Sequence, residues 1–283
     1  MAAQSIGELG KAVQPRFEQF IKERRYLKNV SPRTIQWYEE SFNWLKRYPL
    51  TEDGIKEFVV GMREAGLKAT SCNSRIRVAN AYFKWAGMPL HVGRMREPGE
   101  VLPVFGEEAL QKLISFKPRK WHEKRLLAIV CTLLDCGLRI EECLAVRRVD
   151  VDFDNLLLKV KGKGDKERVV PFSCELRKRL YHWCGQHEFG LVFPTRHGTR
   201  LGRRDVLRDL KALCRRLGFE PPRRTIHALR HTFALNYIRK GGGEFRLQKM
   251  LGHTSLAMTR KYVNLATSDL QEKHEQVSLL GRR

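Results

Sequence analysis

A segment dense in helix-breaking residues, 88–103, is the feature that most constrains how this chain can fold. Its prolines and glycines are Pro89, Gly93, Pro98, Gly99 and Pro103. Such a density of breakers is typical of a linker. The chain has 283 residues, which exceeds the size at which one hydrophobic core usually stops growing. We therefore predict two domains, at residues 12–90 and 104–283, joined by a linker at residues 91–103.

The first predicted domain has the pattern of short amphipathic helices. Ser31 followed by Pro32 is typical of a helix start, because serine caps an N-terminus and proline fits the first turn. Apolar residues then follow at the spacing of one helix face, at Ile35, Tyr38, Phe42 and Leu45. Similar patterns predict helices near residues 17–24, between Thr51 and Gly66, and at residues 71–85. Four helices in so short a span favour a compact bundle.

The second predicted domain is mainly helical and contains one β-hairpin. Residues 156–160 and 168–171 are β-prone, and the glycines and aspartate between these runs suit a tight connection. Longer helical patterns cover residues 203–217 and 226–240, and Ser268 is a candidate cap for a last helix. The predicted fold class is therefore mainly α, with a helical N-terminal bundle and a small β-sheet or hairpin in the C-terminal domain.

The charge of the chain points to a polyanionic partner. Lysine and arginine total 54 against 31 acidic residues, a formal net charge of +23. Residues 194–230 alone hold eleven basic side chains against three acidic ones, so the acids that would balance a solvated face are missing. This favours contact with nucleic acid. The hydrophobic share of 42% is ordinary for a folded chain.

Neither a membrane span nor a disulfide framework is expected. No apolar run approaches the roughly 20 residues that cross a bilayer, and residues 1–11 lack the apolar core of a secretory signal. The seven cysteines are odd in number, scattered, and contain no Cys-x-x-Cys pair, which argues against disulfides or structural zinc. We expect reduced thiols in a cytoplasmic protein that is associated with the nucleoid when it binds DNA.

Four short motifs sharpen this interpretation. In chain order they are Leu138-Arg139-Ile-Glu-Glu142, Gly162-Lys163-Gly164, His227-Ala-Leu-Arg230 and Leu251-Gly252-His253, with Tyr262 nine residues after the last motif. In order and spacing they resemble the tyrosine recombinase (phage integrase) family over roughly residues 104–266. The first domain is similar, more loosely, to the core-binding domain of that family. The short stretch before the first helix suggests the two-domain type, without an additional arm-binding domain.

The chemistry of these residue types agrees with the resemblance. A tyrosine that attacks a phosphodiester stores the bond energy as a phosphotyrosine ester, so a strand can be cut and rejoined without ATP. Two arginines suit the extra negative charge of the pentavalent transition state, because guanidinium groups donate paired hydrogen bonds and stay charged. The phenol has a pKa of about 10, so its proton must be removed as it attacks.

The resemblance implies a role for each motif residue. The catalytic set that it implies is Arg139, Lys163, His227, Arg230, His253 and Tyr262. In that set, Lys163 would protonate the leaving 5′ oxygen, and His227 would be the general base or a shared proton carrier. His253 would bind the scissile phosphate. Glu142 would orient Arg139 or a histidine, although its neighbour Glu141 stays an alternative.

Several further residues are assigned by position only. Candidate DNA contacts are Lys161, Lys166, Arg203 and Arg204. We interpret His231 as structural, since its side chain should point about 100° away from that of Arg230 on a helix. The family needs no metal, and no cofactor is expected.

The resemblance also implies the assembly. It implies a clamp around double-stranded DNA, a homo-tetramer on two recombination sites, and a Holliday-junction intermediate. A C-terminal segment at about residues 268–280 would dock on a neighbouring subunit, and an accessory or directionality factor is an open possibility. Two alternatives remain: a non-catalytic DNA-binding accessory protein of the same fold, and an enzyme similar to type IB topoisomerases.

Overall fold

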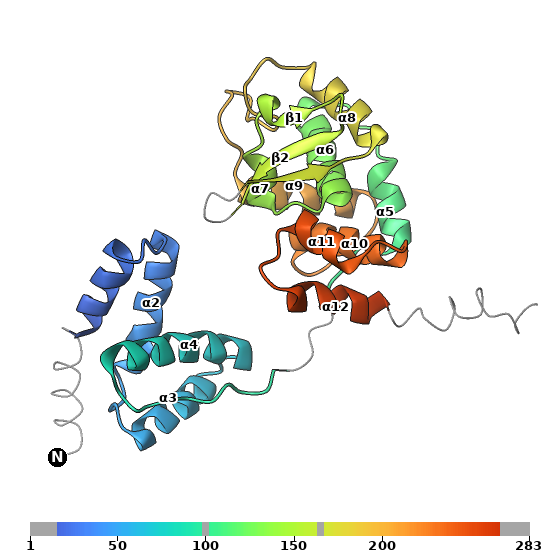
Figure 1. Cartoon of the computed structure of the whole chain (residues 1–283). Coiled ribbons are helices and arrows are strands. Elements are labelled where there is room, and N and C mark those ends of the chain that lie inside the picture. Colours follow the sequence, from blue (N-terminus) through green and yellow to red (C-terminus); the bar gives the residue numbers. More distant parts are fainter. Residues whose placement is uncertain (1–15, 98–101, 163–166, 267–283) are drawn as a thin grey trace, which may run out of the picture. The chain divides into compact units, whose positions relative to one another are not determined.

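The structure is a computed structural model that describes residues 16–97, 102–162 and 167–266 (Figure 1). The chain divides into two compact units, Met1–Glu100 and Val101–Arg283, and each unit is described by itself. Within the described ranges, no helix combines the length and the apolar character needed to cross a membrane.

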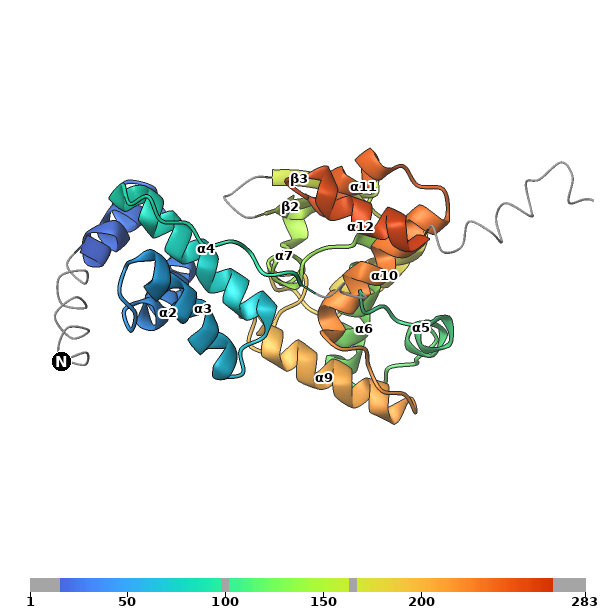
Figure 2. The same cartoon turned by 90° about the horizontal axis from the view of Figure 1, so that it is seen from below.

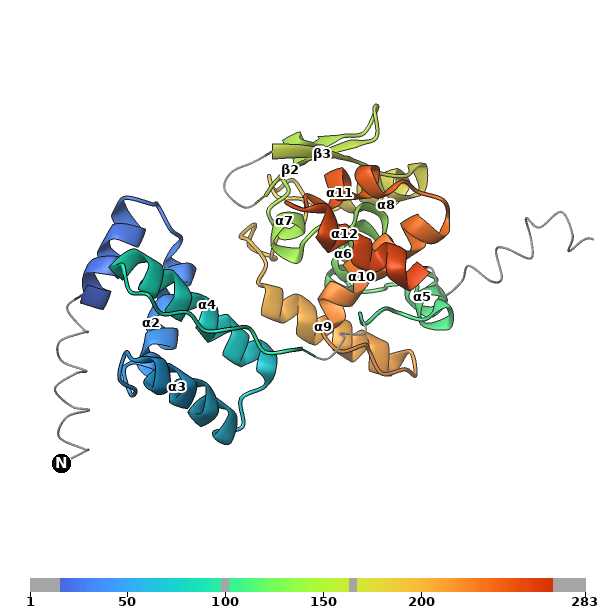
Figure 3. The same ribbon diagram turned by 60° about the horizontal axis from the view of Figure 1, so that its bottom comes forward.

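The N-terminal unit contains the four predicted helices. A first helix covers residues 16–26, and it is followed by α2 (Pro32–Leu45), α3 (Glu52–Glu64) and α4 (Ala69–Ala86) (Figure 3). The side chain of Ser31 accepts a hydrogen bond from the backbone of Thr34, so the predicted helix start is confirmed. The three helices α2, α3 and α4 pack on one another around an aromatic core that includes the fully buried Phe20, Phe58 and Phe83.

A buried helix, α6 (Trp121–Cys136), organises the C-terminal unit (Figure 2). Eleven of its residues are buried, so it is covered on most of its circumference, as expected for a helix enclosed by others. Its neighbours are α5 (Glu107–Ile114), α7 (Ile140–Leu144), α8 (Cys174–Cys184), α9 (Arg203–Arg216) and α10 (Thr225–Arg239). The predicted helices near 203–217 and 226–240 correspond to α9 and α10.

A three-stranded antiparallel sheet accompanies these helices. Its order is β1 (Val151–Asp152), β2 (Leu157–Lys161) and β3 (Glu167–Pro171). The two longer strands pair with Leu158 opposite Val170, and both of these side chains are buried. The predicted hairpin is confirmed as β2 and β3, whereas β1 was not predicted because two residues are too few to show an alternating pattern. The mainly helical fold class with a small sheet is confirmed.

Two short helices complete the described part of this unit. They are α11 (Glu244–Leu251) and α12 (Leu256–Ala266), which pack on each other and on α10. A small apolar cluster joins the three helices through Phe233, Ala234, Leu247, Leu251 and Tyr262. The predicted last helix beginning at Ser268 lies outside the described residues.

Candidate active site

A glycine at the end of α6 turns the chain toward the site. Gly137 has φ 62°, the left-handed conformation that favours glycine. A Cβ at this position would lie 2.2 Å from the ring of Phe233. The turn places Arg139 directly before α7, where its backbone N–H donates to the Glu142 carboxylate at 2.8 Å. The predicted motif is therefore a helix start whose first side chain faces the site.

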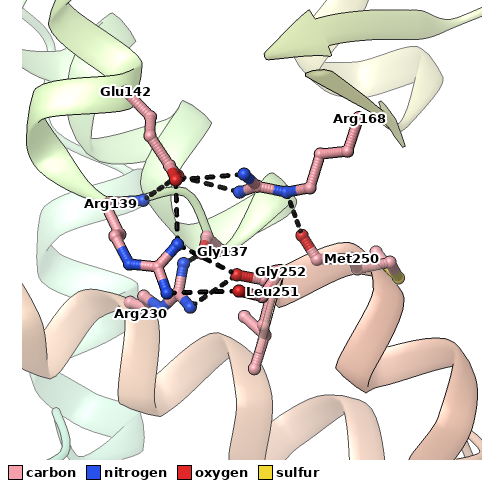
Figure 4. Close-up of polar contacts among 8 residues, drawn as sticks. All are labelled: Gly137, Arg139, Glu142, Arg168, Arg230, Met250, Leu251 and Gly252. Atoms are coloured by element: carbon pink, nitrogen blue, oxygen red, sulfur yellow. Dashed lines mark hydrogen bonds and ion pairs between the residues drawn. The ribbon is translucent and has the colours of Figure 1, made fainter. Parts of the chain in front are cut away.

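Glu142 connects two arginines from different elements (Figure 4). Its carboxylate accepts a 2.9 Å bond from the Arg139 side chain and two bonds, of 3.0 and 2.8 Å, from Arg168 on β3. Burial opposes ionisation of Glu142, but the bonds from Arg168 and Arg139 outweigh it and lower the pKa of this carboxyl. The paired bonds from Arg168 have the fork geometry that fixes a guanidinium relative to a carboxylate.

Backbone carbonyls at the ends of two helices accept further hydrogen bonds from the guanidinium groups of Arg230 and Arg139. Arg230 on α10 donates to the carbonyls of Gly137 and Leu251, each at 2.8 Å. Arg139 donates to the carbonyls of Leu251 at 3.4 Å and Gly252 at 3.3 Å. Gly137 and Gly252 are the residues that end α6 and α11, so both guanidinium groups lie at the negative ends of helix dipoles.

We call the group formed by Arg139, Arg168, Arg230 and Glu142 the arginine cluster. Positive charge is in excess in this cluster. Arg139 and Arg168 share the one carboxylate of the cluster, while Arg230 donates to the neutral carbonyls of Gly137 and Leu251. Burial, and then the charge of Arg139, lower the pKa of Arg230 to about 10. Arg230 therefore stays charged at neutral pH, and the cluster is suited to bind an anion such as a phosphate.

Tyr262 projects from α12 and is only 4% exposed. Its hydroxyl lies 2.8 Å from Nδ1 of His231 on α10. Burial raises the pKa of the Tyr262 phenol, whereas the charges of Arg230 and Arg139 act in the opposite direction. His231 directly follows Arg230 on α10, so its contact with the Tyr262 hydroxyl places the phenol beside the arginine cluster.

Two more histidines belong to the same region. The Nδ1 atom of His253 lies 3.0 Å from the Thr259 hydroxyl, and its ring is nearly parallel to that of Tyr262. Burial, followed by the charges of Arg230, Arg139 and Arg168, lowers the pKa of His253 to about 4. Burial and nearby arginines, Arg203 foremost, also lower the pKa of His227. Both lowered values leave the neutral imidazole as the main form at pH 7.

The structure thus brings together most of the residues that were predicted as catalytic. Those that lie around the arginine cluster are Arg139, Glu142, His227, Arg230, His253 and Tyr262. Lys163 and Lys166 lie outside the described residues. Lys161 is half exposed on β2 and lies 3.5 Å from the Glu167 carboxylate. Arg203 and Arg204 are exposed at the start of α9.

The geometry distinguishes Glu142 from its neighbour. Glu141 is mainly exposed and pairs with Arg200 at 3.0 Å on the surface, whereas Glu142 is the carboxylate that bonds Arg139.

Two residues of the site were missed by sequence reasoning. Arg168 bonds Glu142 from β3, a contact that no local motif indicates. His231, interpreted as structural, contacts the Tyr262 hydroxyl. Within the described residues, no group of three or more His, Cys, Asp or Glu is placed to hold a metal.

Comparison with known proteins gives consistent matches. The sequence profile of the phage integrase family matches residues 103–269. The tyrosine recombinase XerA of Thermococcus kodakarensis is 30% identical over 270 residues, which cover 90% of this chain and 93% of that protein. The tyrosine recombinase XerC of Chromobacterium violaceum is 35% identical over 180 residues, 62% of this chain and 59% of that protein.

Solved structures show a similar fold. The Tn1549 transposon integrase in complex with a circular intermediate DNA matches with a TM-score of 0.74 at 19% identity, covering 87% of this chain and 94% of that one. The XerH site-specific recombinase bound to its palindromic difH substrate matches with a TM-score of 0.72 at 20% identity, over 94% of this chain and 84% of that one. At these identities the likeness concerns the fold.

Proposed function

The chain belongs to the phage integrase family, and from that premise we propose that it is a site-specific tyrosine recombinase. It cuts and rejoins DNA strands without metal or ATP, through a 3′-phosphotyrosyl intermediate and a Holliday junction. The observation that carries the proposal is the arginine cluster, where Arg139 and Arg168 share the Glu142 carboxylate and the charges of Arg230 and Arg139 favour the Tyr262 phenolate.

In the proposed reaction, Tyr262 is the nucleophile. Its Oη forms a bond to the scissile phosphorus and gives up its proton, while the bond from phosphorus to the 5′ oxygen breaks. Lys163 donates the proton that the 5′ oxygen takes up. Rejoining reverses these transfers, with a 5′ hydroxyl of another strand as the attacking group. The energy of the cut bond is kept in the phosphotyrosine ester.

Arg139 and Arg230 stabilise the charge that develops on the non-bridging oxygens. Their guanidinium groups are held in place by Glu142 and by backbone carbonyls before DNA binds, so little reorganisation accompanies the chemical step. His253, neutral at pH 7 because of its lowered pKa, donates a hydrogen bond to the phosphate. His227 acts as a proton carrier at the same phosphate. Glu142 positions Arg139.

The remaining roles concern DNA and assembly. We propose that residues 12–90 bind one face of the duplex and residues 104–283 the other, with Lys161, Lys166, Arg203 and Arg204 contacting the backbone. Four copies assemble on two recombination sites, and residues 268–280 dock on the adjoining copy. An accessory or directionality factor takes part where recombination has a preferred direction. The protein acts in the cytoplasm, associated with the nucleoid.

Covalent capture tests the proposal. The protein is incubated with sheared total DNA of the organism that encodes it, denatured, and the DNA that remains bound is sequenced. We expect enrichment of a small number of sites, with the protein on the 3′ phosphate. Tyr262→Phe should protect the same sites in footprinting and give no adduct. An adduct that persists in this variant would exclude Tyr262 as the nucleophile.

The captured sites also distinguish the proposed recombinase from the two alternative functions. A non-catalytic accessory protein would protect sites without any adduct in the wild-type chain. An enzyme similar to type IB topoisomerases would relax a supercoiled plasmid that lacks the captured site, whereas a recombinase should require the site. The names of the relatives favour recombination, and no feature of the site favours either alternative.

A further inference from the structure

His231 lies where a base for the nucleophile is needed. Its Nδ1 atom is 2.8 Å from the Tyr262 hydroxyl oxygen, which is within the reach required for direct proton transfer. The two rings come from different helices, α10 and α12, which pack on each other. This contact is therefore a tertiary feature of the site that no local motif contains.

We propose that His231 is the general base that removes the proton from Tyr262 during strand cleavage. The inference rests on the proposed function, and it assigns one proton transfer within that reaction to a named atom. The Tyr262 proton moves to Nδ1 as Oη bonds to phosphorus, and it returns from Nδ1 to Oη when the strand is rejoined. His227 and Lys163 then serve the phosphate and the leaving oxygen.

The surroundings of the phenol explain why a base is required. Tyr262 is 4% exposed, so bulk water has little access to its hydroxyl. Burial raises the pKa of the phenol, while Arg230 and Arg139 favour the phenolate. His253 stacks beside the ring, and its Nδ1 is engaged with the Thr259 hydroxyl. Arginines stabilise the phenolate once it has formed, but a charged guanidinium cannot accept the proton.

The position of His231 also fits its neighbour in sequence. Arg230 points from α10 to the carbonyls of Gly137 and Leu251, whereas His231, about 100° further around the helix, points to Tyr262. Two consecutive residues of one helix thus reach the anion site and the nucleophile. A shift of α10 that moved one of them would move the other.

The first test separates proton transfer from positioning. His231→Asn keeps a hydrogen-bond acceptor close to the position of Nδ1 but provides no base, and His231→Ala removes both. We expect single-turnover cleavage of a captured site to slow by about 10²-fold or more in both variants at pH 7. His182→Ala, at an exposed histidine of α8, is the matched control with the wild-type rate. If His231→Asn cleaves at the wild-type rate, His231 is a positioning residue only and the proposal is overturned.

A modified DNA substrate identifies which of the two proton transfers the His231 substitutions impair. When the leaving 5′ oxygen is replaced by sulfur, the leaving group departs as a thiolate and needs no acid. The defect of Lys163→Ala should then disappear, and the defect of both His231 variants should persist. Restoration of the His231 variants on this DNA would assign His231 to the leaving group and contradict the proposal.

Phenol acidity gives an independent readout. Incorporation of 3,5-difluorotyrosine at position 262 makes the phenol more acidic, so it should restore much of the His231→Asn rate and little of the rate lost in Arg230→Ala. The His231→Asn rate should also rise with pH between about 7 and 9, as the phenolate fraction grows. If Tyr262→Phe still forms an adduct, the proposed function itself fails. If the adduct is on Tyr262 and the His231 variants cleave normally, only this inference fails.

Discussion

Arg139, Arg168 and Arg230 are held by hydrogen bonds to a carboxylate and to carbonyls at the ends of two helices. Tyr262, in the same site, lies on a short helix that packs on a small apolar cluster and makes a polar contact with His231. The first region is fixed by directional bonds from α6, α7, β3 and α11, and the second mainly by apolar packing.

This difference fits the two proposed tasks, which are to stabilise developing charge and to attack phosphorus. A group that stabilises developing charge is most effective when it is already oriented, because reorientation during the reaction would cost free energy. A nucleophile must instead approach phosphorus, bond to it and carry a DNA strand. Apolar packing is non-directional and tolerates such displacement better than a set of charged hydrogen bonds. Substitutions in the arginine cluster and in the nucleophile region should therefore differ in their effects on cleavage and on stability.

The largest effect should come from removing a guanidinium. Arg139→Ala or Arg230→Ala should each slow cleavage by roughly 10²–10³-fold, as loss of one preorganised donor does. Binding to the captured site should change little, because the proposed backbone contacts of the other basic residues remain. Single-turnover cleavage and a mobility-shift titration measure the two quantities. Normal cleavage in both variants would mean that these arginines do not carry the developing charge.

The next effect concerns the shared carboxylate. Glu142→Gln leaves the guanidinium groups of Arg139 and Arg168 without their buried counter-charge, so the free energy of unfolding should fall by about 3 kcal/mol. Glu141→Gln is the matched control, because that side chain is 62% exposed and its loss should cost under about 0.5 kcal/mol. Denaturant unfolding measures both. Equal effects would show that Glu142 does not hold the cluster together.

A smaller effect is expected at the glycine that ends α6. Gly137→Ala places a Cβ against Phe233 in a left-handed conformation, and should cost about 2 kcal/mol more than Gly87→Ala. Gly87 ends α4 with a similar φ of 67°, but open space surrounds its Cβ position. Thermal unfolding of the two variants compares a crowded helix end with an uncrowded one. Similar losses of stability in the two variants would mean that the packing around Gly137 rearranges to make room for the added Cβ.

The remaining effect is a pH dependence of stability from the nucleophile region, which is small near neutral pH and grows toward pH 4. The pKa of His253 is about 4 in the folded protein and about 6.5 in an unfolded chain. Between these values the unfolded chain binds a proton that the folded chain does not, so stability should fall as pH decreases from about 6.5 to about 4. His253→Gln should weaken this dependence. A melting series across that range, with wild-type protein alongside, checks it; identical slopes would contradict the lowered pKa.

Local features of the sequence predicted much of the fold. Ser31-Pro32 marked a helix start, and the apolar spacing after it marked the buried face, because caps and periodicity are properties of neighbouring residues. The hairpin of β2 and β3 was predicted for the same reason. The strand β1 was missed, since two residues show no period and its formation depends on pairing with β2.

The site was predictable to the extent that each residue lies in its own local motif. The spacing from Arg139 to Glu142 is one helical turn, and the structure shows the bond that this spacing suggests. Arg168 was missed because its role depends on a partner 26 residues away. The contact of His231 with Tyr262 was not predicted, because it depends on α12, which packs on α10.

The bonds of Arg168 have one more consequence. Its guanidinium is fixed to Glu142 and to the Met250 carbonyl, so the backbone of β3 has a fixed point at this residue. Lys163 precedes Arg168 by five residues, and five residues span at most about 17 Å even when fully extended. The proposed proton donor therefore lies within this chain length of Arg168, whatever path the intervening residues take.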